Sequence, residues 1–334
     1  MMRIAIDAMG GDHAPQAQVE SALAAAAEWP DVHLVLVGDP DAIRPYLGGG
    51  TPDNVSIEPA SEVIGSDDEP VRAVRRKADS SMVVAGRMVK EGRADAMISC
   101  GNTGALMATG LLVVGRMQGI ERPGLAAIFP TLDNKGLLAL DMGANMDAKP
   151  EHLLQYALKG SMYRSKVHGI SKPRIGLLNV GTEAAKGNEV TKAAYGLLEN
   201  APIHFVGNVE ARDVLDGVCD VIICDGFSGN ILLKAIEGAA QSIFKLLREE
   251  LTSSFVSKLA AGALKPSFRR VRTRMDYNEY NGAPLLGING LVVKGHGSSN
   301  ASAMKTAIRQ TRAAISNRLI ASLADEFSES EREQ

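Results

Sequence analysis

Aromatic residues and cysteines are scarce in this sequence. Phe, Trp and Tyr make up 4% of its 334 residues, which disfavours a nucleic-acid surface built on base stacking. The three cysteines, Cys100, Cys219 and Cys224, are an odd number, and we interpret them as reduced thiols rather than a disulfide framework. The net charge of −3 gives no overall attraction to nucleic acid. We therefore predict no nucleic-acid partner.

Long apolar runs are also missing. Asp7 interrupts the first apolar stretch, which argues against a signal peptide. The longest stretch, residues 105–114, contains Thr109 and Gly110 and is too short to span a bilayer. We therefore predict a cytoplasmic protein, unless a surface segment attaches it to the inner face of the membrane.

The usual signatures of nucleotide and metal binding do not occur. The sequence has no G-x-x-x-x-G-K-[ST] pattern, and residues 295–300 lack the third glycine of a dinucleotide fingerprint. It also has no H-E-x-x-H and no C-x-x-C, and Asp141 and Asp147 are more typical of turns than of a carboxylate metal site. We predict neither a cofactor nor a metal.

Strand and helix patterns alternate along most of the chain. Strands are predicted at residues 3–9, 32–37, 55–57, 96–99, 125–129, 137–140, 174–178, 203–206, 221–224 and 291–293, and residues 282–290 are predicted to be a loop. Helices are predicted at 15–29, 71–77, 82–91, 151–163, 188–198, from 231 onward, and at 301–323, before a polar, frayed tail at 325–334. This order predicts an α/β fold: a mostly parallel sheet with helices on both faces, a Rossmann-like α/β/α sandwich in which residues 1–334 form a single catalytic unit.

Four predicted strands end in loops rich in Gly, Asn, Ser or Thr, each followed by helical sequence. The loops are Gly10-Gly11 and residues 101–104, 225–230 and 295–299. Such loops expose backbone N–H groups, and the next helix adds the positive end of its dipole. One such loop is ordinary turn chemistry, but four on one edge of a parallel sheet favour a phosphate-type ligand, either inorganic phosphate or a phosphopantetheine arm.

The polar residues of these loops, and of the 179–188 loop, are the candidate site. Each histidine or asparagine has a structural alternative as a turn or cap residue, and Lys186 has one as a solvated side chain. The candidate catalytic residues are His13, Lys186, Asn188 and Asn230. The candidate contacts to phosphate or acyl donor are Gly10, Gly11, Asn102, Thr103, Gly104, Asn179, Thr182, Ser228, Gly229, His296 and Ser298. An acyl-cysteine at Cys100 or Cys224 is an alternative that we disfavour, because buried cysteines usually act as small apolar residues.

An apolar stripe continues from residue 231 to about 263, and its second half carries many basic residues. The first half is typical of a core or dimer helix. Residues 251–275 are predicted to project as an amphipathic, basic segment that Gly262 and Pro266 interrupt, with membrane contacts at Phe255, Leu259 and Leu264. The apolar stripe also includes Val256, and the basic residues are Lys258, Lys265, Arg269, Arg270, Arg272 and Arg274. Such a segment suits an anionic membrane surface, and the alternative is docking of an acidic carrier protein.

Several motifs also carry a family resemblance across nearly the whole chain. They are RIAIDAMGGDHAP at 3–15, GNTGA at 101–105, NVGTE at 179–183, DGFSGN at 225–230 and GHG at 295–297. Together they resemble the bacterial phosphate acyltransferases, fatty acyl-acyl carrier protein:phosphate transacylases that make acyl-phosphate for phospholipid synthesis. The resemblance implies acyl carrier protein and inorganic phosphate as partners, membrane association, a homodimer, and as a further partner the membrane acyltransferase that uses acyl-phosphate.

Three other functions remain open from the sequence. A short-chain acyl-CoA:phosphate acyltransferase would have similar anion loops. A hydroxy-acid dehydrogenase is disfavoured by the missing nucleotide fingerprint. A phosphate- or lipid-sensing membrane protein would bind ligand without consuming thioester.

Overall fold

Alternating apolar residues place β1, Met2–Asp7, between two layers of helices. Ile4 and Ile6 pack in one core with α1 and α10, whereas Ala5 packs on the opposite face with α4 and α5. This alternation is the two-residue period of a strand buried on both faces. The computed structural model describes residues 1–274 and 280–332, without the side chains of residues 256, 272–274 and 329–332.

The first sheet has seven strands in the order β3-β2-β1-β4-β12-β11-β5. All neighbouring pairs from β3 to β12 are parallel, and β11 is antiparallel to both β12 and β5. Its other strands are β2 (Val32–Gly38), β3 (Val55–Pro59), β4 (Ala96–Ser99), β5 (Gly124–Leu125), β11 (Ala283–Leu286) and β12 (Leu291–Lys294). The helices in this part of the chain are α1 (Gln16–Glu28), α2 (Pro40–Ile43), η1 (Arg44–Tyr46), α3 (Pro70–Arg76), α4 (Ser81–Lys90), α5 (Thr103–Thr109), the π-helical η2 (Gly110–Val114), α10 (Ala301–Ser316) and α11 (Leu319–Arg332).

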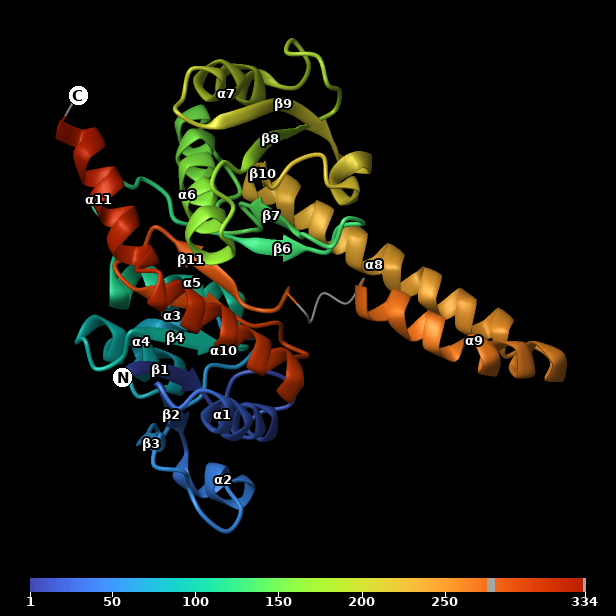
Figure 1. The fold of residues 1–334 in the computed structure, drawn as a ribbon. Coiled ribbons are helices and arrows are strands. Elements are labelled where there is room, and N and C mark those ends of the chain that lie inside the picture. The colour runs from blue at the N-terminus through green and yellow to red at the C-terminus, as the bar shows by residue number, and fades with distance from the viewer. Residues whose placement is uncertain (275–279, 333–334) are drawn as a thin grey trace.

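The second sheet has five strands in the order β6-β7-β10-β8-β9, parallel except for the β6–β7 pair. The strands are β6 (Ala127–Phe129), β7 (Leu137–Leu140), β8 (Arg174–Asn179), β9 (His204–Glu210) and β10 (Val221–Ile223). Its helices are α6 (Pro150–His168), α7 (Glu189–Glu199), η3 (Ala211–Asp216), α8 (Gly226–Leu251) and α9 (Phe255–Arg274). In Figure 1 this sheet lies above the seven-stranded one. The mostly parallel α/β architecture predicted from the sequence is confirmed.

The sheets meet where the chain passes from β5 to β6. A single residue, Ala126, separates these two strands, and each lies at the edge of a different sheet. The sequence prediction of one strand over 125–129 is therefore wrong. As a consequence, the four glycine loops do not share one sheet edge: three follow β1, β4 and β12 of the first sheet, and the fourth follows β10 of the second.

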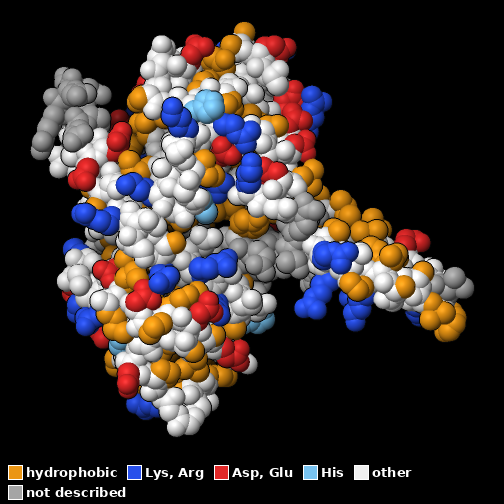
Figure 2. Space-filling view, in the orientation of Figure 1, with side chains coloured by type: hydrophobic (Ala, Val, Ile, Leu, Met, Phe, Trp, Pro, Cys, Tyr) orange, Lys and Arg blue, Asp and Glu red, His pale blue; other side chains and the backbone are white. Residues whose placement is uncertain are grey.

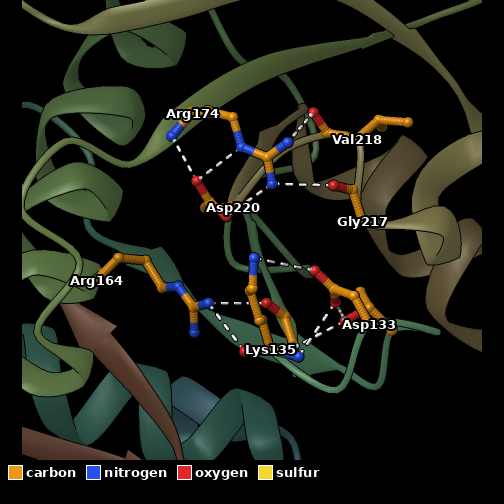
Figure 3. Close-up of polar contacts among 9 residues, drawn as sticks. Asp133, Lys135, Arg164, Arg174, Gly217, Val218 and Asp220 are labelled. Carbon is orange, nitrogen blue, oxygen red and sulfur yellow. Dashed lines mark hydrogen bonds and ion pairs between the residues drawn. The ribbon is translucent and has the colours of Figure 1, made fainter.

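Hydrogen bonds from two arginines stabilise the amino ends of β8 and β10 and the β6–β7 turn. The Arg174 backbone N–H and Nε donate to Asp220 Oδ2 at 2.8 and 3.1 Å, and Nη2 donates to Asp220 Oδ1 at 3.0 Å and to the Gly217 carbonyl at 2.9 Å. Nearby, Arg164 Nη2 donates to the carbonyls of Lys135 and Gly136 in the β6–β7 turn (Figure 3). This network stabilises the sheet at the end opposite to its loop-bearing carboxyl edge.

The projecting helices form a hairpin rather than one interrupted helix. Figure 1 shows the distal half of α8 and the whole of α9 standing away from the sheets, packed side by side. The chain turns at 252–254, where Thr252 Oγ1 donates to the Arg248 carbonyl at 2.7 Å and Ser253 Oγ donates to the Glu250 carbonyl at 2.8 Å. These side chains satisfy carbonyls left unpaired at the end of α8. The predicted interruptions at Gly262 and Pro266 are wrong, since α9 continues through both.

Two further sequence predictions need correction near the C-terminus. Residues 282–290 are not only loop, because Ala283–Leu286 form β11. The closing helix is two helices, which separate at Asn317 and Arg318; Arg318 has the left-handed φ of 53° that ends a helix. The tail from Asp325, predicted to fray, continues α11 to Arg332, and residues 333–334 lie outside the described part of the chain.

Candidate active site

Three glycine loops meet at the carboxyl edge of the seven-stranded sheet. They follow β1, β4 and β12, which are adjacent and parallel, so their ends lie together. Asp7, at the end of β1, accepts hydrogen bonds of 2.6 Å from both Ser81 Oγ and Ser99 Oγ. Burial raises the pKa of the Asp7 carboxyl, although the two hydroxyl hydrogen bonds oppose this shift. Asp7 therefore joins β1, β4 and α4 beneath the site.

Gly11 allows these loops to touch. Its φ is +106°, and a Cβ there would lie 2.9 Å from Cys100 Cβ and 3.1 Å from the Gly297 carbonyl oxygen. The next backbone N–H, that of Asp12, donates to the same Gly297 carbonyl at 2.8 Å. Through these contacts the Gly10-Gly11 loop packs against the loops that follow β4 and β12.

A cleft of about 290 Å³ lies between the two sheets, above these loops. Its walls come from the β5–β6 connection, the loops after β4 and β12, the residues before β11, and the first turns of α8. Three of the predicted site residues line it: Thr103, Asn230 and His296. The cleft therefore unites one predicted residue from the second sheet with two from the first.

One face of α8 forms a wall of the cleft. Asn230, Leu233, Lys234 and Glu237 line it, and their spacing of three and four residues puts them on the same side of the helix. The helix begins at a cap, because the Asp225 carboxylate accepts hydrogen bonds from the Ser228 N–H and Oγ, each 2.8 Å long. The first turn presses closely on the loop after β7.

Gly229 permits that close approach. A Cβ on Gly229 would lie 2.1 Å from the Asp141 carbonyl oxygen, which no side chain can tolerate. The predicted residues Ser228 and Gly229 therefore serve the cap and the helix packing, and in doing so they aim Asn230 at the cleft.

The opposite wall carries two basic side chains, Lys294 and His296. The Lys294 ammonium group donates to the carbonyls of Cys100, at 3.4 Å, and of Gly295. Burial lowers the pKa of Lys294, and the nearby acidic groups of Asp7 and Asp12 oppose the shift only in part. The amine at this site therefore loses its proton at a lower pH than an exposed lysine does.

His296 is held by its backbone and by its ring. Its N–H donates to Asn281 Oδ1 at 3.0 Å, and its ring Nδ1 lies 2.9 Å from Ser298 Oγ. Asn281 is itself buried and donates to the Ala303 carbonyl at 2.9 Å. On the cleft side, His296 Nε2 lies 4.0 Å from Glu237 Oε1 of α8. The predicted residue Ser298 thus supports the imidazole.

Several predicted residues of the first sheet do not line the cleft. His13 is exposed at the start of the α1 segment, and Gly104 packs against Pro70. Asn102 caps α5, since its Oδ1 accepts from the Ala105 N–H at 3.0 Å, and its Nδ2 donates to three carbonyls of the 65–68 loop. The side chain of Asn102 is therefore engaged in joining two loops.

The predicted residues of the 179–188 loop lie at the carboxyl end of β8. Asn188 Oδ1 caps α7 by accepting from the Thr191 N–H, and Asn179 Nδ2 donates to the Lys186 carbonyl at 3.1 Å. Thr182 and Lys186 are exposed. Because β8 and β10 are parallel neighbours, this loop shares a sheet edge with Asn230, but its residues do not line the cleft described above.

Four charged or amide side chains of the cleft were not among the predicted site residues: Lys234, Glu237, Asn281 and Lys294. The sequence carries a signal for three of them. Lys234 and Glu237 follow Asn230 at four and seven residues along the same helix, and Lys294 ends a strand directly before the GHG motif. Asn281 gives no such signal, since only the tertiary fold brings it beneath His296.

The cysteines are buried and poorly suited to nucleophilic attack. Burial raises the pKa of Cys100 to about 11 and that of Cys219 to about 12, and it raises the pKa of Cys224 as well. A thiol attacks as its thiolate, so a raised pKa lowers its reactivity at neutral pH. The raised pKa values therefore disfavour the alternative of an acyl-cysteine intermediate at Cys100 or Cys224.

The described residues include no group of three or more His, Cys, Asp or Glu side chains placed to hold a metal ion. Within the same part of the chain, no helix combines the length and apolar character needed to cross a bilayer.

Comparison with known proteins gives one consistent family. A family described as "Fatty acid synthesis protein" matches residues 2–322. A phosphate acyltransferase from Brevibacillus brevis is 61% identical over 92% of this chain and 92% of its own length, and one from Geobacillus thermodenitrificans is 58% identical over 98% and 99%.

Among solved structures, a phosphotransacetylase from Streptococcus pyogenes has a similar fold, with a TM-score of 0.58, 18% identity and 93% coverage of both chains. Because these relatives are 58–61% identical over more than nine-tenths of the chain, and the family model matches residues 2–322, the chain belongs to the phosphate acyltransferase family.

Proposed function

We propose that the chain transfers a fatty acyl group from the thioester of acyl carrier protein to inorganic phosphate. The product is acyl-phosphate for phospholipid synthesis, and the carrier thiol is released. The observation that carries this proposal is the cleft itself, which Asn230 on α8 lines together with Lys294, at the end of β12, and His296, in the loop that follows it. Such a cleft can hold a small anion and a thioester side by side. The relatives named phosphate acyltransferases support acyl transfer to phosphate as its reaction.

The chemistry requires positioning more than acid–base catalysis. A phosphate oxygen attacks the thioester carbonyl carbon, a C–O bond forms, and the electron pair of the breaking C–S bond leaves on sulfur. Phosphate already carries anionic oxygens at neutral pH, and a thiol of pKa about 8.5 is a good leaving group. The main requirements are therefore to hold both reactants together and to stabilise the oxyanion.

Residues on the two walls of the cleft meet these two requirements. Lys294 and the glycine-loop amides bind phosphate through charge and N–H donors. The Asn230 amide donates to the carbonyl oxygen as it becomes an oxyanion. His296 protonates the departing sulfur or donates to phosphate, and Glu237 orients its ring. Lys186 and Asn188, at the same sheet edge as Asn230, and His13 beside the glycine loops complete the set as contacts to the donor or to phosphate.

The α8–α9 hairpin supports a peripheral membrane role on the inner face of the cell membrane. Phe255, Leu259 and Leu264 on α9 are 76%, 62% and 50% exposed. They lie among the exposed basic residues Lys258, Lys265, Arg269 and Arg270, whereas the side chains of Val256, Arg272 and Arg274 lie outside the described residues. Figure 2 shows apolar and basic side chains together along this projection. Such a surface suits anionic lipid and would deliver acyl-phosphate to a membrane acyltransferase.

The same hairpin supports a homodimer. Ile243, Leu246 and Leu247 of α8 are 57%, 61% and 41% exposed, which is unusual for three large apolar residues within two turns of a helix. A second copy of the hairpin would cover them. Dimerisation through α8 leaves the apolar residues of α9 available for lipid.

A thiol-release assay tests the proposed reaction. Purified protein is incubated with hexadecanoyl-acyl carrier protein or with acetyl-CoA, with and without phosphate, and the free thiol is measured. Phosphate-dependent release of carrier thiol is expected. Release of CoA thiol alone would instead assign the chain as a short-chain acyl-CoA:phosphate acyltransferase, and ligand binding without thiol release would exclude both reactions.

A further inference from the structure

A second cavity, of about 350 Å³, lies next to the catalytic cleft and is not used by the reaction described above. We call it the side cavity. Its apolar walls are formed by Met107, Leu111, Leu112, Pro123, Ala144 and Leu285. These residues come from α5 and the π-helical turn η2, from the segment before β5, from the loop after β7, and from β11.

The walls of the cleft continue directly into the side cavity. On α5, Thr103 lines the cleft and Met107, one turn later, lines the side cavity. On β11, Ala283 lines the cleft and Leu285, the next residue on the same face of the strand, lines the side cavity. A helix advances about 6 Å in four residues, and a strand advances about 6–7 Å in two. The two cavities are therefore successive parts of one groove.

Two further pairs of residues show the same progression. Leu125 and Met142 line the cleft, whereas Pro123 and Ala144 line the side cavity. Pro123 precedes Leu125 by two positions and Ala144 follows Met142 by two, which is the spacing of Ala283 and Leu285 on β11. Four chain segments, among them the paired strands β5 and β11, thus lead from the cleft to the side cavity.

Four polar residues line the side cavity: Arg122 is exposed, and the other three take part in hydrogen bonds or ion pairs. Arg116 Nη1 donates to the Glu121 carbonyl at 2.8 Å, and the Glu121 carboxylate pairs with His152 Nε2 at 2.9 Å. Asn145 Nδ2 donates to the Pro123 carbonyl at 2.5 Å and to Asp141 Oδ2 at 3.2 Å. An occupant therefore meets mainly hydrocarbon.

We propose that the side cavity binds the acyl chain of the thioester, with the reacting carbonyl in the cleft beside Asn230. This inference rests on the proposed acyl transfer. The pantetheine arm of the donor fits the side cavity less well, because its two amides need hydrogen-bond partners and six of the ten lining residues are apolar. The depth of the side cavity then sets which chain lengths are used. Leu111 and Leu112, 41% and 48% exposed, lie at its outer rim and contact the chain of a long substrate.

Filling the side cavity tests this inference. In Ala144→Leu, the added carbons occupy the space of the chain. We expect kcat/KM for hexadecanoyl-acyl carrier protein to fall by about tenfold or more, since a single methylene in an apolar pocket changes discrimination by that much. For butanoyl-acyl carrier protein, kcat/KM stays within about twofold of the parent, because a short chain does not reach Ala144. An equal loss for both lengths, or no loss for either, would overturn the inference.

A second variant avoids the buried wall. Leu111→Glu places a charge at the exposed rim, where folding is unaffected, and the same selective loss for the long chain is expected. Ala27→Leu on α1 and Leu197→Glu on α7 are matched controls at exposed positions far from the groove. Both controls retain the chain-length profile of the parent.

Binding of hexadecanoate by equilibrium dialysis separates this inference from the proposed function. It requires no carrier protein and no turnover. Loss of hexadecanoate binding in Ala144→Leu and Leu111→Glu, but not in the controls, supports the side cavity even if the parent releases no carrier thiol. Unchanged binding in both variants overturns it, and a simultaneous change of Leu111→Glu from dimer to monomer would assign the exposed leucines to a subunit contact.

Discussion

Glu237 Oε1 lies 4.0 Å from His296 Nε2, and the two residues reach this position from different sheets. Glu237 belongs to α8, which begins after β10 of the five-stranded sheet, and His296 belongs to the loop after β12 of the seven-stranded sheet. The pair thus spans the cleft. The arrangement that we propose for catalysis therefore depends on how the two sheets are packed against each other, and neither sheet has it alone.

Replacing Glu237 tests whether it orients the imidazole. In Glu237→Gln the side chain keeps its shape but loses its charge, and we expect kcat to fall by up to about fivefold, since a partly exposed pair is worth up to about 1 kcal/mol. Steady-state kinetics at saturating phosphate measure this change. Glu250→Gln, farther along α8 and exposed, is the control and keeps the parent kcat. A parent-like kcat in Glu237→Gln would leave His296 without this partner in catalysis.

Asn230→Ala is expected to lower kcat by about 10²–10³-fold, because a missing oxyanion donor typically costs this much. The comparison is Asn200→Ala, which removes an exposed side-chain amide at the end of α7 that donates to the Gly196 carbonyl and belongs to no part of the proposed site. An active Asn200→Ala enzyme together with an impaired Asn230→Ala enzyme assigns the oxyanion contact to Asn230. Both variants are followed by thermal unfolding, so that a loss of folded protein is not counted as a loss of catalysis.

The glycine loops could be predicted from the sequence because each is a local pattern: an apolar strand, then glycine, then a helix cap. The division into two sheets could not, because residues 125–129 read as one continuous strand. Only tertiary pairing separates β5 from β6 at Ala126. The same limit applies to the site. Asn230 stands in a local motif, whereas Lys294 and Glu237 gain their role from residues distant in the chain.

The hairpin shows the limit of helix-breaking residues as a guide. Gly262 and Pro266 are the visible breakers, yet α9 continues through them, and the chain turns at 252–254. Hydrogen bonds from Thr252 and Ser253 side chains to the last carbonyls of α8 replace the missing helical bonds there. Proline removes one backbone donor, and the packing of α9 on α8 compensates for that loss.

Lys294 gives the binding of phosphate a pH dependence. Burial lowers the pKa of its ammonium group, so the positive charge is lost at a lower pH than in an exposed lysine. We therefore expect the KM for phosphate, measured at two pH values, to be larger at the higher pH, where more of the group has lost its proton. Lys294→Gln should raise this KM about tenfold or more at the lower pH, since a hydrogen bond to a charged group contributes about 1.5–3 kcal/mol, and should remove most of the further rise.

Lys90→Gln is the control for Lys294, because Lys90 is exposed on α4 and its loss changes charge without touching the cleft. If Lys294→Gln keeps the parent KM at both pH values and only unfolds more easily, then Lys294 anchors the Cys100 and Gly295 carbonyls and does not bind phosphate.

Leu259 tests the membrane surface of α9. Its side chain is 62% exposed, so Leu259→Glu removes apolar contact with lipid without disturbing a core. We expect binding to vesicles of anionic lipid, measured by sedimentation, to weaken by about tenfold or more, since burying a leucine contributes roughly 1.5–3 kcal/mol. Turnover of dissolved substrate stays near that of the parent. Leu197→Glu on α7 keeps parent-like vesicle binding, and an unchanged result for Leu259→Glu would assign the stripe to protein packing.

Lys159 makes the stability of the fold depend on pH. It is completely buried on α6, its Nζ donates to the Arg122 carbonyl at 2.7 Å, and burial lowers its pKa to about 7. In the unfolded chain the pKa of a lysine is about 10.4. Between these two values the unfolded state binds one more proton than the folded state does. The free energy of unfolding therefore rises with pH in this window, by up to about 1.4 kcal/mol per pH unit. Well below pH 7 the lysine is protonated in both states, so it adds no pH dependence there.

Lys159→Met should remove that slope. Urea unfolding at about pH 7, 8 and 9 is expected to show a free energy that changes less with pH in the variant than in the parent, by up to about 1.4 kcal/mol per pH unit. Lys166→Met, at an exposed position on the same helix, keeps the parent slope. Equal slopes in Lys159→Met and the parent would mean that the buried ammonium group retains its proton, stabilised by the Arg122 carbonyl and by the face of the Tyr156 ring 4.7 Å away.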